Sequence, residues 1–365
     1  MEKREIGKWG AASALITLII TKSLISTPSL FARRSASAGW IEVLISGLFE
    51  LIVLAIVLKL AAYFENKDPV DIAYIAFGSV GKYITGMISI LVFIISSAAV
   101  FRCFCELMRD NVLKGISYND VSLFVLIASI AGAFLGVGVL INSCGVILPF
   151  VLISLCVIVL INTPRYSISN ILPVSGYGID KLLYNSFFKN ASFFEIGALL
   201  YFVPKIGEKT SVKKIGFTAL IVSVLLSSVL ALSYQLSVPY EVSGTFALPL
   251  YQMTRMIKAG TFFQRIEPLN VFVWGGAMYT YVSIGVRISA DIYKKTFSLT
   301  HAKPLVFVFA YIVSLVALIP SSETNVERIY DFLMTYSYIA YPILPLLLLI
   351  CSKLFGRKGC IFEKN

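Results

Sequence analysis

Ten long apolar segments constrain the fold of this 365-residue chain more than any other feature. A transmembrane helix needs ~20 apolar residues to cross a bilayer core of ~30 Å, and a helix satisfies its own backbone hydrogen bonds in lipid. We therefore predict an all-α integral membrane protein with about ten transmembrane helices, forming a single polytopic domain over residues 1–365. The segments are residues 9–30, 41–62, 81–107, 121–139, 143–162, 191–204, 214–235, 268–290, 304–320 and 331–352.

The composition supports a membrane protein. Apolar residues make up 58% of the chain and charged residues 14%, with a mean hydropathy of +0.85, whereas soluble domains have ~45–50% apolar and ~25% charged residues. Lysine and arginine are more frequent in the loops that face the cytoplasm if the N-terminus lies inside. This asymmetry predicts two cytoplasmic termini. It also accounts for the net charge of +11 without a nucleic-acid partner.

The sequence offers little for catalysis or metal binding. It has six cysteines with no CxxC spacing and a single histidine, His301. Nucleotide-binding, metalloprotease and serine-hydrolase signatures are absent, as are paired carboxylates with a plausible cleft. We therefore predict no enzyme activity, no catalytic residues, no cofactor and no metal.

The first apolar segment, residues 9–30, is interrupted by polar residues. Thr21, Lys22 and Ser23 fall inside it, and Pro28 follows before it ends. Lys22 lies ~20 Å along a helix from Trp9, a depth at which a charge is costly unless it faces a cavity or a partner. Transporters place such breaks where a substrate binds. The alternative is that Lys22 extends to the nearer surface and that Pro28 makes a simple kink.

The sixth segment, residues 191–204, has a matching interruption. It is only 14 residues long and contains Glu195 and Gly197. Short, interrupted segments at corresponding positions of two halves indicate an inverted repeat with a site near the membrane midplane. The segments therefore predict two repeats of five helices each, over about residues 9–162 and 191–352.

Other polar residues inside the segments have both a binding and a packing interpretation. Ser96 and Ser97 lie in the third segment, and Thr280 and Tyr281 form part of a polar and aromatic stripe in the eighth. Helix packing explains such a stripe equally well. Arg102 and Glu106 share one helix face, where they form either part of a site or a helix-end pair near the headgroups.

Three connections can also be predicted. Asp68 followed by Pro69 indicates the start of a short interfacial helix. The fourth and fifth segments are separated only by residues 140–142, which we predict to be a tight turn. Residues 163–190 are predicted to form a polar loop.

Several stretches, in order and over nearly the whole chain, resemble the B subunit of bacterial spore germinant receptors. This is the GerAB-type endospore germination permease family of the amino acid–polyamine–organocation superfamily. The stretches are SLISTP in the first segment, AGW at 38–40, ENKDPVDIAYIAFGSVGKYITG at 65–86, ILPVSGYGID at 171–180, FFEIGALLYFVPKI at 193–206 and ALPLYQMTRMIKAGTFFQRIEPLNVFVW at 247–274.

The resemblance implies a LeuT-like fold of five-plus-five inverted repeats with discontinuous first and sixth helices. It also implies a complex with an A subunit and a lipoprotein C subunit in the inner membrane of the spore. One departure concerns the first segment, where relatives have a glycine-containing motif and this chain has TKSLISTP. Lys22 therefore brings a charge to the usual break, which indicates an altered ligand.

Our leading hypothesis is a sensor that binds a small nutrient germinant, an amino acid, at the membrane midplane. The ligand carboxylate would meet N–H groups near Ser23 and Leu24 and the ammonium of Lys22. The ligand ammonium would meet carbonyls near Gly197, with Glu195 as its partner or as the partner of Lys22. The predicted ligand-binding residues are Thr21, Lys22, Ser23, Leu24, Ser96, Ser97, Phe194, Glu195, Gly197, Thr280 and Tyr281.

Two alternatives remain open from the sequence. The protein could be a secondary transporter for amino acids, with Lys22 at the place of a coupling cation. It could also be a conduit for ions or water, which the polar residues of the third and eighth segments support only weakly. The fold by itself does not choose among them.

Overall fold

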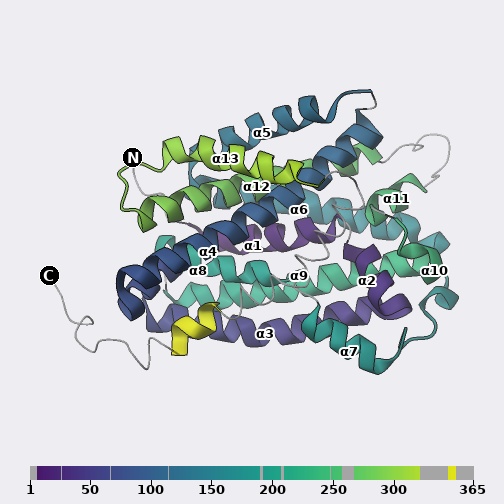
Figure 1. Cartoon of the computed structure of the whole chain (residues 1–365). Coiled ribbons are helices and arrows are strands. Elements are labelled where there is room, and N and C mark those ends of the chain that lie inside the picture. Colours follow the sequence, from purple (N-terminus) through teal and green to yellow (C-terminus); the bar gives the residue numbers. More distant parts are fainter. Residues whose placement is uncertain are drawn as a thin grey trace.

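The computed structural model describes residues 6–25, 27–65, 67–113, 115–189, 192–206, 209–246, 248–256, 267–320 and 344–350. Within these ranges the chain is almost entirely helical, and the one extended pairing is an isolated bridge between Ile6 and Ile206. Figure 1 shows the helices running roughly along one common direction. The α-helices are α1 (Lys8–Ser23), α2 (Thr27–Ser35), α3 (Gly39–Tyr63), α4 (Pro69–Leu107), α5 (Tyr118–Leu135), α6 (Val137–Asn162), α7 (Ile179–Phe188), α8 (Leu199–Phe202), α9 (Lys209–Ser237), α10 (Tyr240–Ser243), α11 (Pro249–Arg255), α12 (Glu267–Thr296) and α13 (Lys303–Leu318).

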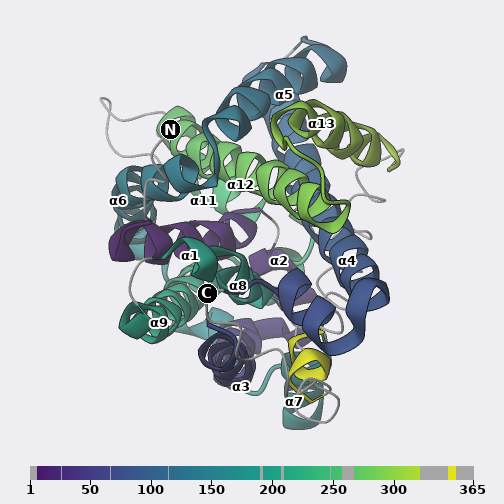
Figure 2. The same cartoon turned by 90° about the vertical axis from the view of Figure 1, so that its left-hand side faces the viewer.

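Helix α1 forms the centre of the bundle. Every residue from Gly10 to Ser23 is buried, and the end view of Figure 2 places α1 among α6, α9 and α12. Around it, α4 packs along α12 and α3 packs along α9. Because α1 is buried on all sides, polar side chains within it must find partners on the surrounding helices.

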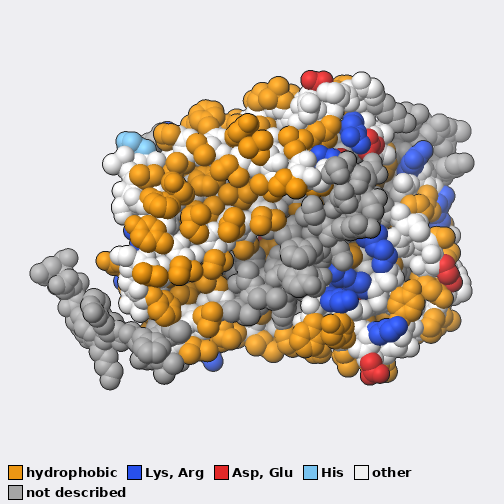
Figure 3. Space-filling model, viewed as in Figure 1, with side chains coloured by type: hydrophobic (Ala, Val, Ile, Leu, Met, Phe, Trp, Pro, Cys, Tyr) orange, Lys and Arg blue, Asp and Glu red, His pale blue; other side chains and the backbone are white. Residues whose placement is uncertain are grey.

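The outside of the bundle is suited to lipid. In Figure 3 hydrophobic side chains cover a broad band of the visible face, and charged side chains gather toward one end. Large apolar side chains such as Phe124, Ile127 and Phe307 are more than half exposed. Six helical stretches within the described ranges are long and apolar enough to span a membrane: Thr27–Tyr63, Pro69–Val112, Tyr118–Leu135, Val137–Arg165, Val212–Ser237 and Val271–Thr296.

These helices agree with the predicted segments. The second, seventh and eighth segments correspond to α3, α9 and α12, and the ninth corresponds to α13. Of the predicted tenth segment, residues 331–352, only 344–350 lie within the described residues, and these are helical. The all-α class is therefore confirmed, while the count of ten spans and the two-repeat division stay predictions.

The helix start predicted at Asp68 is confirmed, while the interfacial position of the helix stays a prediction. Asp68 caps the N-terminus of α4 in a reciprocal capping box with Asp71, and Pro69 occupies the first turn. Helical geometry is then interrupted at Gly78, whose φ of 67° and ψ of −152° are not helical. The first part of α4 is thereby set off from its long membrane part by a glycine kink, because this backbone conformation is essentially restricted to glycine.

We expect Gly78→Ala to destabilise the protein by about 1–3 kcal/mol, since a Cβ is strained at this φ and ψ. Space is not the cause, because nothing lies within 4 Å of an added Cβ at Gly78. The measurement is thermal unfolding of the purified protein in detergent. Gly276→Ala is a matched control inside α12, where the nearest atom to an added Cβ is Ile147 Cγ2 at 3.8 Å. A Gly78→Ala protein that unfolds no earlier than the parent would contradict the prediction.

The turn between the fourth and fifth segments lies earlier than predicted. Helix α5 ends at Leu135 and α6 begins at Val137, so the break is at Gly136 rather than at residues 140–142. Gly136 has a φ of 93°, which a glycine adopts without strain. The prediction was wrong because the apolar run continues through the turn, and hydropathy carries no signal of where the backbone changes direction.

The predicted polar loop at 163–190 also contains a helix. Its last part forms α7, whose buried residues are Leu182, Asn185 and Ser186, and this helix packs against α3. The prediction missed α7 because the helix is short and has only a narrow buried face.

Candidate functional site

The two predicted interruptions are both present, and they meet. Helix α1 ends at Ser23 and α2 begins at Thr27, so the first crossing is broken after Ser23. The sixth crossing consists of three short pieces, which are the 3₁₀ turn Phe194–Ala198 (η5), α8 and the 3₁₀ turn Val203–Lys205 (η6). Helix α1 contacts η5. The breaks therefore share one place in the bundle.

Local hydrogen bonds explain how the first crossing changes direction. The Thr27 hydroxyl donates to the carbonyl of Lys22 over 2.8 Å, and the N–H of Ile25 donates to the same carbonyl over 3.0 Å. The N–H of Leu24 donates to Ile20 over 3.0 Å. The expectation of a free N–H group at Leu24 is therefore corrected, because the turn satisfies that group within its own helix end.

A buried ion pair joins the two breaks. Lys22 Nζ lies 2.7 Å from Glu195 Oε2, and the two side chains are only 4% and 5% exposed. The Lys22 ammonium also lies 3.5 Å from the ring centroid of Phe194. A cation so placed is stabilised by the ring as well as by the carboxylate. Of the alternatives left by the sequence, Lys22 does not extend to the surface, and Glu195 pairs with Lys22.

Helix α12 contributes to the same cluster. Tyr281 donates a hydrogen bond to Glu195 Oε1 over 3.0 Å, so each oxygen of this carboxylate has a partner from a different element. Breaking a buried, hydrogen-bonded pair by removing one partner is far more costly than removing an exposed pair. The cluster of Lys22, Phe194, Glu195 and Tyr281, which we call the break cluster, is therefore held by three separate crossings.

Glu50 belongs near the break cluster but was not predicted. This residue lies in α3, is 2% exposed, and interacts electrostatically with both Lys22 and Glu195. Its Oε1 atom is buried without a hydrogen-bond partner among the described residues. A buried acceptor without a partner is costly, so this atom points to a missing donor. The sequence signal was an acidic residue in the middle of segment 41–62, whose other charged residues, Glu42 and Lys59, lie nearer its ends.

Three predicted residues use their hydroxyl groups in packing. Thr21 donates to the Thr17 carbonyl over 2.6 Å, and Thr280 donates to Gly276 over 2.9 Å and to Ala277 over 2.8 Å. Ser23 shares a hydrogen bond of 2.9 Å with Ser227 of α9. Hydroxyls bonded in this way support helix geometry and helix contacts, and the structure does not direct them toward the break cluster.

The remaining predicted residues lie in other surroundings. Ser97 faces Gly285 of α12 so closely that a Cβ on that glycine would lie 2.0 Å from Ser97 Oγ, and Ser96 is buried in the same helix. Ser97 Oγ has no hydrogen-bond partner within the described part of the chain. Gly197 borders a small cavity together with Ser89 and Tyr201. Of these residues, Ser97 offers the clearest unused polar atom.

The Arg102–Glu106 pair is buried where α4, α5 and α13 meet near their ends. Arg102 Nε lies 2.7 Å from Glu106 Oε1, and both side chains are about one-tenth exposed. Arg102 also donates to the carbonyl of Ala317 over 3.3 Å and lies 4.3 Å from the ring centroid of Tyr118. The pair therefore joins α4 to α13 and to the start of α5, which is a structural role.

Metal binding is not indicated by the described side chains. No group of three or more histidine, cysteine or acidic residues within those ranges could hold an ion. The break cluster together with Glu50 offers one ammonium, two carboxylates, a phenol and an aromatic ring.

Known sequences that resemble this chain are spore germination proteins. The family model described as "Spore germination protein" matches residues 6–326. The chain is 24% identical to spore germination protein YndE of Bacillus subtilis (strain 168), covering 94% of this chain and 95% of that one. It is 24% identical to spore germination protein GerLB of Bacillus cereus over 97% and 96%, and 23% identical to spore germination protein KB of Bacillus subtilis (strain 168) over 78% of each.

The fold has a counterpart among solved structures. A Na⁺-coupled sialic acid symporter, solved in a substrate-bound outward-open state, superposes with a TM-score of 0.62. The match covers 96% of this chain and 78% of the symporter at 13% sequence identity. At that identity the likeness shows the fold alone, and the fold is the LeuT-like transporter architecture.

Proposed function

This chain belongs to the spore germination protein family, and on that premise we propose that it is the B subunit of a spore germinant receptor. In this proposal the ligand is a small nutrient, an amino acid, that binds at the break cluster at mid-depth in the membrane. The protein lies in the inner membrane of the spore with both termini in the cytoplasm. It passes the binding signal to an A subunit and a lipoprotein C subunit.

The observation that carries this proposal is the buried Lys22–Glu195 pair between two interrupted crossings. An ion pair inside a membrane protein is costly and is typical of a ligand or ion pathway. A polar break in two crossings also provides the location where transporters of this architecture hold their substrates. Structural packing alone does not require a charge at either position.

The chemistry of the break cluster suits a zwitterion. A ligand carboxylate could replace Glu195 as the partner of Lys22, while the ligand ammonium pairs with Glu195 and with Oε1 of Glu50, which has no hydrogen-bond partner among the described residues. In the bound state every charge of the break cluster and of Glu50 then has a partner, which limits the desolvation cost. It also separates Lys22 from Glu195 and so separates the two breaks.

That separation provides the switch in our proposal. The empty state is held by the direct Lys22–Glu195 contact, and the bound state is held by contacts through the ligand. A ligand shifts two states only through its differential affinity for them. Ligands that carry both a carboxylate and an ammonium satisfy this condition here, because each end replaces one half of the broken pair.

The test is the germination response of spores that carry Lys22→Ala or Glu195→Gln. Loss of one partner of a buried charge contact costs about 2–5 kcal/mol of binding, so we expect the half-maximal germinant concentration to rise at least about 30-fold in each variant. Lys303→Ala, an exposed lysine at the start of α13, is the charge-matched control. An unchanged dose response in both site variants, at normal protein levels, would reject this site.

The second candidate function is a secondary amino acid transporter. The observation that favours it is the fold shared with a Na⁺-coupled symporter, and Lys22 could then stand in for a coupling cation. Substrate-dependent counterflow in proteoliposomes separates the two functions, because a sensor that does not transport moves no labelled substrate. Counterflow that disappears in Glu195→Gln would favour the transporter.

A further inference from the structure

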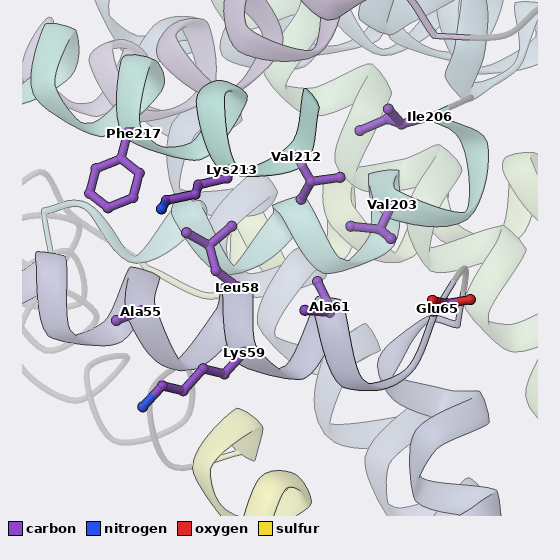
Figure 4. A pocket seen from close by; sticks show the side chains of 11 residues that line it. Ala55, Leu58, Lys59, Ala61, Glu65, Val203, Ile206, Val212, Lys213 and Phe217 are labelled. Atoms are coloured by element: carbon purple, nitrogen blue, oxygen red, sulfur yellow. The ribbon is translucent and has the colours of Figure 1, made fainter. Parts of the chain in front are cut away.

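A second binding site lies away from the break cluster, between the end of α3 and the beginning of α9. The cavity there has a volume of about 640 Å³, which is within the range of known ligand sites. Its walls come from α3, η6 and α9 (Figure 4). The residues that line it are Ala55, Leu58, Lys59, Ala61, Ala62, Glu65, Val203, Ile206, Val212, Lys213 and Phe217.

Two lysines give the cavity its charge. Lys59 of α3 and Lys213 of α9 are both exposed, and neither forms an ion pair with a described residue. Figure 4 places the Lys213 ammonium beside Phe217 and the Lys59 ammonium beyond Ala55 on the other side of α3, whereas Glu65 lies at the opposite end of the cavity. The cavity therefore combines an apolar wall with a positive region that has no negative partner in the described part of the chain.

The predicted position of the cavity in the membrane helps to identify its ligand. Lys59 lies four residues before the end of α3 at Tyr63, which is ~6 Å along the helix. The same end of the bundle holds the contact of the Ile6 N–H with the Lys205 carbonyl, and the distribution of basic residues predicts that this end is cytoplasmic. Basic pockets between transmembrane helices on that side bind anionic lipid headgroups.

We propose that this cavity binds one anionic phospholipid of the cytoplasmic leaflet. Its phosphate lies at the end of the cavity near Ala55 and Phe217, where the ammonium groups of Lys59 and Lys213 attract it. One acyl chain lies against Ala55, Leu58 and Phe217. Lysine side chains of this length reach the headgroup level while their stems cover apolar surface. Glu65, at the far end, disfavours a second negative charge there and leaves room for a single phosphate.

The helices that line this cavity also carry residues close to the break cluster. Helix α3 also carries Glu50, and α9 carries Ser227, the partner of Ser23. A lipid wedged between α3 and α9 would hold these two helices at a fixed separation. The lipid is therefore expected to stabilise the bundle as well as to occupy the cavity.

The experiment is native mass spectrometry of the purified full-length protein with equal amounts of phosphatidylglycerol, phosphatidylethanolamine and phosphatidylcholine of identical acyl chains. We expect one phosphatidylglycerol to be retained in preference to the others. At ~1 kcal/mol for each lysine, Lys59→Gln or Lys213→Gln should weaken retention about 5-fold and the double variant about 30-fold. A Lys82→Gln, Lys303→Gln double variant removes the same charge from the same predicted side and should change retention little.

Two further arms test the cavity itself. Ala55→Trp fills the apolar wall without changing charge and should reduce lipid retention as strongly as the double lysine variant. Inorganic phosphate in excess should leave the lipid bound, because phosphate alone lacks the acyl contact. Equal retention of all three lipids would overturn the proposal, and so would an unchanged Ala55→Trp protein. A preference for phosphatidylethanolamine that is lost in Glu65→Gln would also overturn it, since the ligand would then be zwitterionic.

Discussion

Replacing Lys22 by methionine is expected to lower the free energy of unfolding by about 3–5 kcal/mol, because the change leaves the Glu195 carboxylate buried without its counter-charge. Methionine keeps most of the apolar stem, so the loss reports the charge rather than a cavity. Glu195 would retain only the hydrogen bond from Tyr281. The measurement is unfolding of the purified protein in mixed micelles with increasing denaturing detergent.

The matched control for this prediction is the double variant Lys22→Met, Glu195→Gln. Removing both charges eliminates the unpaired ion, and the amide of glutamine can still accept the hydrogen bond from Tyr281. We therefore expect the double variant to be more stable than Lys22→Met alone, which gives a coupling energy of several kcal/mol in a double-mutant cycle. Additive effects of the two changes would show that Lys22 and Glu195 do not interact in the folded protein.

Glu50→Gln is expected to raise the half-maximal germinant concentration at least about 30-fold while leaving the protein well folded. The change removes an acceptor charge for the ligand ammonium, and loss of such a contact costs about 2–5 kcal/mol of binding. The Lys22–Glu195 contact of 2.7 Å does not involve Glu50, so stability should be kept or slightly increased. The dose response of spores and the thermal stability of the purified protein provide the two measurements.

Glu42→Gln is the control on the same helix. Glu42 is also buried in α3, but it accepts a hydrogen bond of 2.6 Å from Ser35, and it interacts electrostatically with Arg34 and Lys189 rather than with Lys22. This variant should leave the germinant response near that of the parent. If Glu42→Gln and Glu50→Gln shift the response equally, Glu50 has no special role in ligand binding.

Much of the architecture follows from local properties of the sequence. Runs of ~20 apolar residues specify membrane helices, since the cost of exposing a peptide group to lipid leaves no other local choice. Asp68, Pro69 and Asp71 specify a helix start because capping involves only near neighbours. The break after Ser23 was also predictable, since polar residues and a proline interrupt an apolar run within a few positions of one another.

The composition of the candidate site was only partly predictable. The sequence pointed to Lys22, Phe194, Glu195 and Tyr281, which the structure brings together. It gave no reason to separate them from Thr21 or Thr280, whose hydroxyls are used within their own helices. Glu50 was missed because its importance comes from neighbours that are more than twenty residues away in the sequence.

By itself, then, the sequence determined the class of protein, most of its crossings and the two positions where a crossing is broken. Each of these depends on hydrophobicity or capping over a few consecutive residues. The tertiary structure alone decided that Lys22 pairs with Glu195 and that α7 packs on α3. It also decided that Glu50 interacts with this pair while one of its oxygens has no hydrogen-bond partner among the described residues. The physical reason is that a buried polar group is satisfied by whichever neighbour packing brings near, and that neighbour is not encoded in local hydrophobicity.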